Sequence, residues 1–130
     1  MRLKSAIWVS AYLRRAQVEG ADAVLRRRGA EEAGAIFIKV SRLDGTADLY
    51  GPAPQTAFGD EDPGDRMFAP SMPQPAMPDA DIEAKLTREM RFDPDLWIVE
   101  VEDRAGRHFL DRRGQCWLDE AGVGRLGADC

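Results

Sequence analysis

Five carboxylates lie within the short segment 93–103: Asp93, Asp95, Glu100, Glu102 and Asp103. Carboxylates that converge at the end of a strand can hold a divalent metal ion, which activates water for hydrolysis. Many metal-dependent nucleases carry Pro-Asp followed by Glu-x-Lys. Here Glu100-Val101-Glu102 has no lysine at the third position, and Pro94-Asp95 lies too close before it. A metal-dependent hydrolase or nuclease is therefore an alternative, and the sequence favours a solvated strand edge.

A second group of chemically capable residues consists of arginines in two runs, which are Arg14, Arg15 and Arg26, Arg27, Arg28. Their forked guanidinium groups could gather and grip phosphates. Arginine is abundant throughout the chain, with fifteen arginines against three lysines, so its presence alone says little. No RNA-recognition, helix-turn-helix or zinc-finger signature accompanies it. Nucleic-acid binding is a further alternative, and nucleic acid is not the expected partner.

Residues for other chemistries are too few. His108 is the only histidine, and with Cys116 and Cys130 it cannot complete a zinc site within one chain. No G-x-S-x-G elbow marks a nucleophilic serine. The sequence therefore implies no cofactor, assigns no catalytic residue and favours a protein that is not an enzyme.

Length and composition describe one small domain. The 130 residues match the common size of a single core, and we expect residues 1–111 to form it, with 112–130 as a tail or short extension. A disulfide between the two cysteines near the C-terminus could not staple that core, which favours reduced thiols and a cytoplasmic location. No stretch approaches the roughly 20 apolar residues that span a bilayer, so no membrane contact is expected.

Charge is distributed unevenly along the chain. The formal net charge is −5, but residues 1–42 carry nine Lys/Arg against four Asp/Glu, whereas residues 43–103 carry four against fifteen. Folding can neutralise this asymmetry internally. Alternatively, the asymmetry leaves a surface with two signs of charge that docks a partner.

The first half of the chain predicts a helix, an edge strand and a hairpin. Apolar residues recur at helical spacing over 5–19, where Ser5 is a candidate N-cap. The segment 22–28 is short and favours an edge strand, and GAIFIKVSRL is typical of a central strand. Asp44-Gly45 suits a two-residue hairpin turn before the alternating TADLYG.

The second half begins with a long surface loop from Gly51 to Asp79, which holds seven of the eight prolines. A helix is predicted over 80–91, with Asp79 as its candidate N-cap. LWIVEVED then reads as a strand near 96–103, and RHFLD can return as a short partner strand.

These elements predict an α+β fold. An antiparallel sheet of about four to five strands is covered on one face by both helices, and the Pro-rich loop runs over the surface. The function that this favours is a small non-enzymatic binding or protein-interaction module, with another protein or a second copy of the chain as its partner.

Three stretches also resemble a known family. They are KSAIWVSAYLRRA, GAIFIKVSRLDGTADLYGPAP and RFDPDLWIVEVED, which together cover much of residues 4–103. The family that the sequence resembles consists of small bacterial proteins catalogued as a domain of unknown function. The resemblance implies a compact bacterial cytosolic domain and implies no activity, ligand or catalytic residue.

Overall fold

The computed structural model describes residues 4–53 and 67–110 of the chain. Within them, two helices accompany a six-stranded sheet, which confirms the predicted α+β class. The helices are α1 (Ser5–Val18) and α3 (Asp79–Phe92), and the strands are β1 (Asp22–Arg27), β2 (Ile36–Ser41), β3 (Thr46–Pro52), β4 (Phe68–Pro70), β5 (Met77–Pro78) and β6 (Trp97–Glu102). The expected tail at 112–130 lies outside the described residues.

The strands are ordered β1-β6-β2-β3-β4, and β5 also pairs with β3. All pairs are antiparallel except β2 with β6, which run parallel. The sheet is therefore mixed, whereas the sequence predicted an antiparallel one. The physical reason is the connection: after β3 the chain passes through α3 and returns beside β2 in the same direction, as parallel neighbours require a long crossover.

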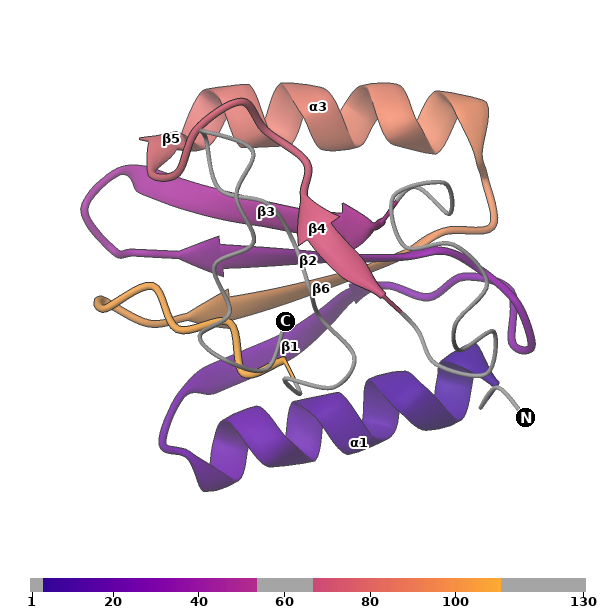
Figure 1. The fold of residues 1–130 in the computed structure, drawn as a ribbon. Coiled ribbons are helices and arrows are strands. Elements are labelled where there is room, and N and C mark those ends of the chain that lie inside the picture. Colours follow the sequence, from indigo (N-terminus) through magenta and orange to yellow (C-terminus); the bar gives the residue numbers. More distant parts are fainter. Residues whose placement is uncertain (1–3, 54–66, 111–130) are drawn as a thin grey trace.

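The central strand β2 is buried on both of its faces. Ile36, Ile38 and Val40 belong to one core cluster, and Phe37 belongs to a second cluster on the opposite face. A strand that is buried on both sides needs cover on both sides of the sheet. The two helices provide that cover (Figure 1).

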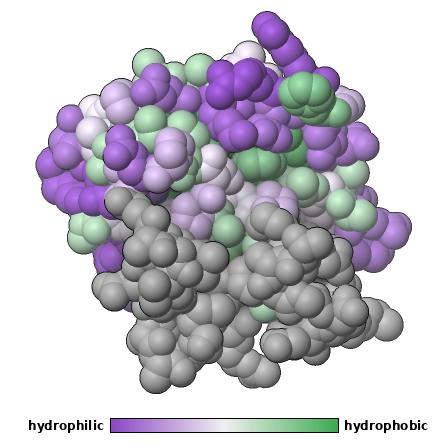
Figure 2. Space-filling view, turned by 45° about the horizontal axis from the view of Figure 1, so that its top comes forward, coloured by the Kyte–Doolittle hydropathy of each residue, from purple (hydrophilic) through white to green (hydrophobic). Residues whose placement is uncertain are grey.

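Each helix packs on its own face of the sheet. Val9, Tyr12 and Ala16 of α1 join the cluster of Ile36, whereas Ile82 and Leu86 of α3 join the cluster of Phe37. The prediction that both helices lie on one face is therefore wrong, because apolar side chains of β2 point to both faces, Phe37 to one and Ile38 to the other, and neither face can be left to water. The outward side of the molecule near α3 is mostly hydrophilic in its described part (Figure 2). Neither described helix is long and apolar enough to cross a membrane.

The segment predicted as one long loop contains two short strands. β4 and β5 both add to β3. Pro52, Pro70 and Pro78 stand at strand ends, where the missing N–H of proline does not interrupt a ladder. The described part of the predicted loop is thus an extension of the sheet; residues 54–66 lie outside the described residues.

Three further local predictions, two helix N-caps and a return strand, are wrong. Ser5 begins α1 without capping it, and its hydroxyl donates instead to the carbonyl of Gly34 at 2.7 Å. α3 starts at Asp79, with Pro78 at the N-cap position and no side-chain cap. No strand is present between Arg107 and Leu110, the described part of the predicted return strand. There the carbonyl of His108 accepts a hydrogen bond from the Tyr12 hydroxyl, so the segment is tied to α1 and not to β6.

The hairpin between β2 and β3 is confirmed, but its turn differs from the predicted two-residue type. The Arg42 N–H donates to the Thr46 carbonyl at 3.0 Å, which leaves a three-residue loop over 43–45. Leu43 has φ 65° and Gly45 has φ 92°. The side chain of Asp44 accepts from the Thr46 N–H at 3.0 Å and fixes the loop. A branched residue at positive φ carries backbone strain.

Replacing Leu43 by asparagine relieves that strain. Leu43 is 44% exposed, so little apolar burial is lost, and asparagine adopts the left-handed region more readily. We expect Leu43→Asn to raise the free energy of unfolding by about 0.5–1 kcal/mol in urea titration. Leu43→Val serves as the control, because its β-branch worsens the strain. A wild type more stable than Leu43→Asn would contradict the assigned turn.

Candidate interaction site at the edge of β1

The structure separates the five carboxylates of segment 93–103. The carboxylate of Asp93 accepts from the Asp95 N–H at 3.0 Å in the turn before β6. Glu102 ends the strand about 20 Å away at the usual rise per residue. Asp103 is buried and pairs with Arg107 at 2.8 Å, which holds the pKa of its carboxyl below its usual range. Among the described residues, no group of three or more His, Cys, Asp or Glu side chains could hold a metal ion.

The five arginines likewise have different neighbours. Arg14 and Arg15 lie on the exposed side of α1. Arg27 donates to the Pro94 carbonyl at 2.7 Å, and the Arg28 guanidinium lies 5.2 Å from the centroid of the Trp97 ring. Arg26 pairs with carboxylates. The arginines therefore support separate local contacts.

Arg26 belongs to an ionic network between the sheet and α3. Its guanidinium contacts both Glu83 carboxylate oxygens, at 2.7 and 3.0 Å, and Glu100 at 3.2 Å. Lys39 of β2 is only 4% exposed, and its ammonium lies 2.5 Å from Asp79 and 2.6 Å from Glu83. The network joins β1, β2 and β6 to the first half of α3.

The network sets the charge states of its members. The hydrogen bond from Arg26, supported by Lys39, lowers the pKa of Glu83 to about 2. Burial lowers the pKa of Lys39, but the hydrogen bonds to Asp79 and Glu83 outweigh it, so the pKa is raised. A buried ammonium without these partners would be strongly unfavourable. Lys39 thus requires the acidic first turns of α3 above it.

The first strand, β1, lies at one edge of the described sheet. β1 pairs only with β6 among the described strands. Val24 is 56% exposed and Leu25 is 38% exposed. A register shift between Leu25 and Arg27 leaves Arg26 as an extra residue in the ladder, as in a β-bulge.

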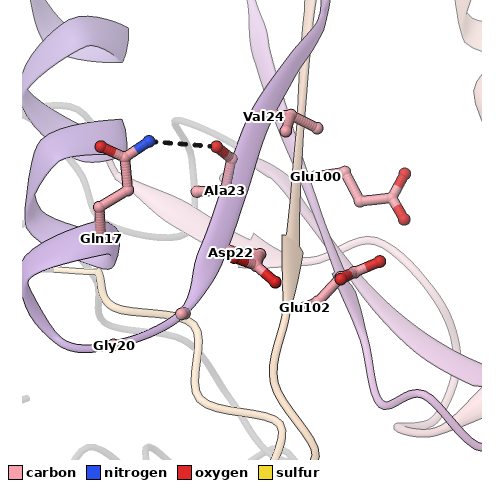
Figure 3. Close-up of a pocket in the computed structure, with 8 residues that line it drawn as sticks. Gln17, Gly20, Asp22, Ala23, Val24, Glu100 and Glu102 are labelled. Atoms are coloured by element: carbon pink, nitrogen blue, oxygen red, sulfur yellow. Dashed lines mark hydrogen bonds between the residues drawn. The ribbon is translucent and has the colours of Figure 1, made fainter.

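A pocket with acidic lining lies along this edge. It is lined by Gln17, Gly20, Ala21, Asp22, Ala23, Val24, Glu100 and Glu102. Asp22, Val24, Glu100 and Glu102 project to the side of the two strands away from Gln17 (Figure 3). Asp22 stands directly opposite Glu102 in the ladder. Like charges at opposed positions repel each other, and neither carboxylate has an ion-pair partner in the described part of the chain.

Backbone polar groups of β1 also point outward at this edge. The Gln17 side chain donates to the Ala23 carbonyl at 3.3 Å, so that carbonyl points away from β6. In an antiparallel ladder the N–H and C=O of one residue point to the same side and alternate along the strand. The polar groups of Ala23 and Leu25 therefore point outward, and those of Val24 point to β6.

This arrangement presents several groups to solvent at one edge. It offers outward backbone groups, two exposed apolar side chains and two carboxylates that have no ion-pair partner among the described residues. Sequence reasoning found Glu100 and Glu102 and missed Asp22, Val24 and Gln17. Only the register of β1 against β6 reveals that Asp22 opposes Glu102. The predicted edge strand at 22–28 was the one available signal, and the structure confirms it.

The fold and this edge define a small α+β domain with a mixed, open sheet. The family model for DUF1491, described as "Protein of unknown function", matches residues 3–111. The chain belongs to this family, which confirms the resemblance to a family of unknown function. No curated protein matches the chain.

Solved structures of bacterial relatives agree with the fold. A crystal structure of a DUF1491 family protein from Caulobacter crescentus CB15 is 40% identical, with a TM-score of 0.69, and the match covers 85% of this chain and 94% of that one. The solution structure of protein Atu0922 from A. tumefaciens is 46% identical, with a TM-score of 0.67, covering 78% and 86% respectively.

The ionic network predicts a specific pH dependence. The folded-state pKa of Glu83, about 2, lies below its ordinary value of 4.5. Its ionised form therefore contributes stability above pH 4.5, and this contribution is lost as the pH falls toward 2. We expect Glu83→Gln to lower the free energy of unfolding by roughly 1 kcal/mol at pH 7, allowing for solvent screening. Urea titrations should show the gap to wild type narrowing below pH 4.5.

Glu89→Gln is the matched control on the same helix. Glu89 pairs with Lys85 at 2.9 Å on the outside of α3 and takes no part in the network. Its removal should change stability by less than about 0.5 kcal/mol. A gap between Glu83→Gln and wild type that stays constant from pH 7 to pH 3 would contradict the role assigned to Glu83.

Proposed function

We propose that this domain is a non-enzymatic protein-interaction module that binds an extended, positively charged polypeptide segment along the free edge of β1. The segment adds a strand to the sheet. Main-chain hydrogen bonds supply affinity in this mode of recognition, and alternate side chains supply specificity. The observation that best supports the proposal is the exposed Val24 at the edge of the described sheet. It lies beside Asp22 and Glu102, which have no ion-pair partner among the described residues.

The chemistry of the edge supports this choice of ligand. The outward groups of Ala23 and Leu25 match the backbone of an incoming strand. A lysine or arginine on that strand would relieve the repulsion between Asp22 and Glu102. A negatively charged ligand such as nucleic acid is disfavoured at the same place.

The proposed location is the cytoplasm. Its support is that the chain has only two cysteines, both near the C-terminus, where a disulfide could not cross-link the core. The alternative of a metal-dependent hydrolase finds no support in the described residues, since Asp93 and Asp95 lie at one end of β6 and Glu102 at the other. The alternative of a nucleic-acid binder finds none either, since Arg26, Arg27 and Arg28 each contact different groups.

Display selection of random extended peptides on the immobilised chain tests the proposal. The chain is attached at low density so that copies do not meet one another. We expect enriched peptides to combine alternating apolar residues with lysine or arginine. Val24→Lys should weaken their binding at least about tenfold, or ~1.4 kcal/mol, because it adds a positive charge at the strand edge.

Val18→Lys is the matched control. Val18 is 77% exposed on α1, outside the pocket at the edge, so the same charge there should leave peptide affinity unchanged. Failure to enrich any peptide, or equal effects of the two lysines, would remove the proposed function. Thermal unfolding of both variants checks that each remains folded.

A further inference from the structure

The strand β1 is complementary to itself, and this narrows the choice of partner. We propose that the segment which binds the edge is β1 of a second copy of this chain, paired antiparallel with its Val24 opposite Val24. This inference rests on the proposed function and names its partner. The two sheets then form one continuous sheet across a two-fold axis.

The alternation of side chains between the two faces of the sheet determines which residue of β1 can lie on the two-fold axis. A two-fold axis perpendicular to the sheet keeps each face on its own side, as a C2 dimer with a continuous sheet requires. Residues opposite one another must then be separated by an even number of positions in the sequence, because side chains alternate between faces. Centring on Val24 satisfies this rule and places the most exposed apolar residue of the strand on the axis.

Charge complementarity follows from the same register. Two positions on either side of Val24 are Asp22 and Arg26, so each Asp22 stands opposite Arg26 of the other copy. Both side chains lie on the face of the sheet that carries α3, since Arg26 contacts Glu83 there. Arg26, whose guanidinium contacts Glu83 and Glu100 in its own copy, then also lies beside Asp22 of the other copy, once at each end of the pair.

The backbone also fits this register. The outward groups of Ala23 in one copy meet those of Leu25 in the other, which forms hydrogen-bonded pairs on both sides of the axis. Val24 occupies the non-hydrogen-bonded position between them, where opposed Cα atoms lie about 4.5 Å apart. The 3.3 Å hydrogen bond from Gln17 to Ala23 is long, and the incoming strand replaces it.

Disulfide trapping tests the register directly. The test variant is Val24→Cys in a background with Cys116→Ser and Cys130→Ser. In the proposed pairing, the Cα atoms of the two introduced cysteines lie within the 4.4–6.8 Å separation that a disulfide needs. Leu25→Cys is the matched control. Its two copies are offset along the strand, about 8 Å apart between Cα atoms, which is too far for a bridge. We expect mild air oxidation to link Val24→Cys into a dimer at least about tenfold faster than Leu25→Cys.

A second measurement uses the native cysteines and no oxidation. Sedimentation equilibrium of the unmodified chain should show a concentration-dependent dimer, which Asp22→Arg weakens at least about tenfold by opposing Arg26. Asp81→Arg, an equal charge change on the exposed side of α3, should leave the dimer unchanged.

The outcomes separate this inference from the function on which it rests. Equal linking of Val24→Cys and Leu25→Cys, or a monomer at every concentration, overturns self-pairing. If selected peptides still bind the edge and lose affinity with Val24→Lys, the interaction module stands with a different partner. If no peptide is selected and no dimer is found, both the proposed function and self-pairing are contradicted.

Discussion

The double-sided burial of β2 is the constraint on which the structure depends. Ile36, Ile38 and Val40 point to one side and Phe37 and Lys39 to the other, and all are buried. Each face of the sheet therefore needs a helix, and α1 and α3 take opposite faces (Figure 1). Lys39 adds a requirement on the second face, because a buried ammonium must be paired. Asp79 and Glu83 meet it from the first turns of α3.

The position of α3 explains why the opposite edge is acidic and open. α3 packs over β3 and β5, pairs with Lys39 of β2, and touches β1 through the contact between Glu83 and Arg26. On that face, Asp22, Val24 and Glu102 of the outer two strands remain outside its cover. The pairing with Lys39 fixes α3 over β2, and Val24 of β1 therefore remains exposed.

Much of the fold could be predicted from local patterns. Helical spacing placed α1 and α3 within one or two residues, and the alternation around Asp44-Gly45 placed the hairpin. The side on which α3 packs could not be predicted, because Lys39 in the middle of β2 resembles a solvent-facing residue until its two carboxylate partners are known. The strands β4 and β5 were missed because their short proline-bordered sequences gain stability only from pairing with β3. The interaction site depended on register, so Glu100 and Glu102 were named for a different chemistry and Asp22 not at all.

Hydrogen exchange of individual amides in β1 tests most directly whether this edge receives a second strand. Ala23 and Leu25 point outward and Val24 points to β6, so the three neighbouring amides report on the two sides of one strand. Self-pairing predicts that the protection of Ala23 and Leu25 rises with chain concentration while that of Val24 stays constant. Protection of all three amides that is independent of chain concentration would contradict the account.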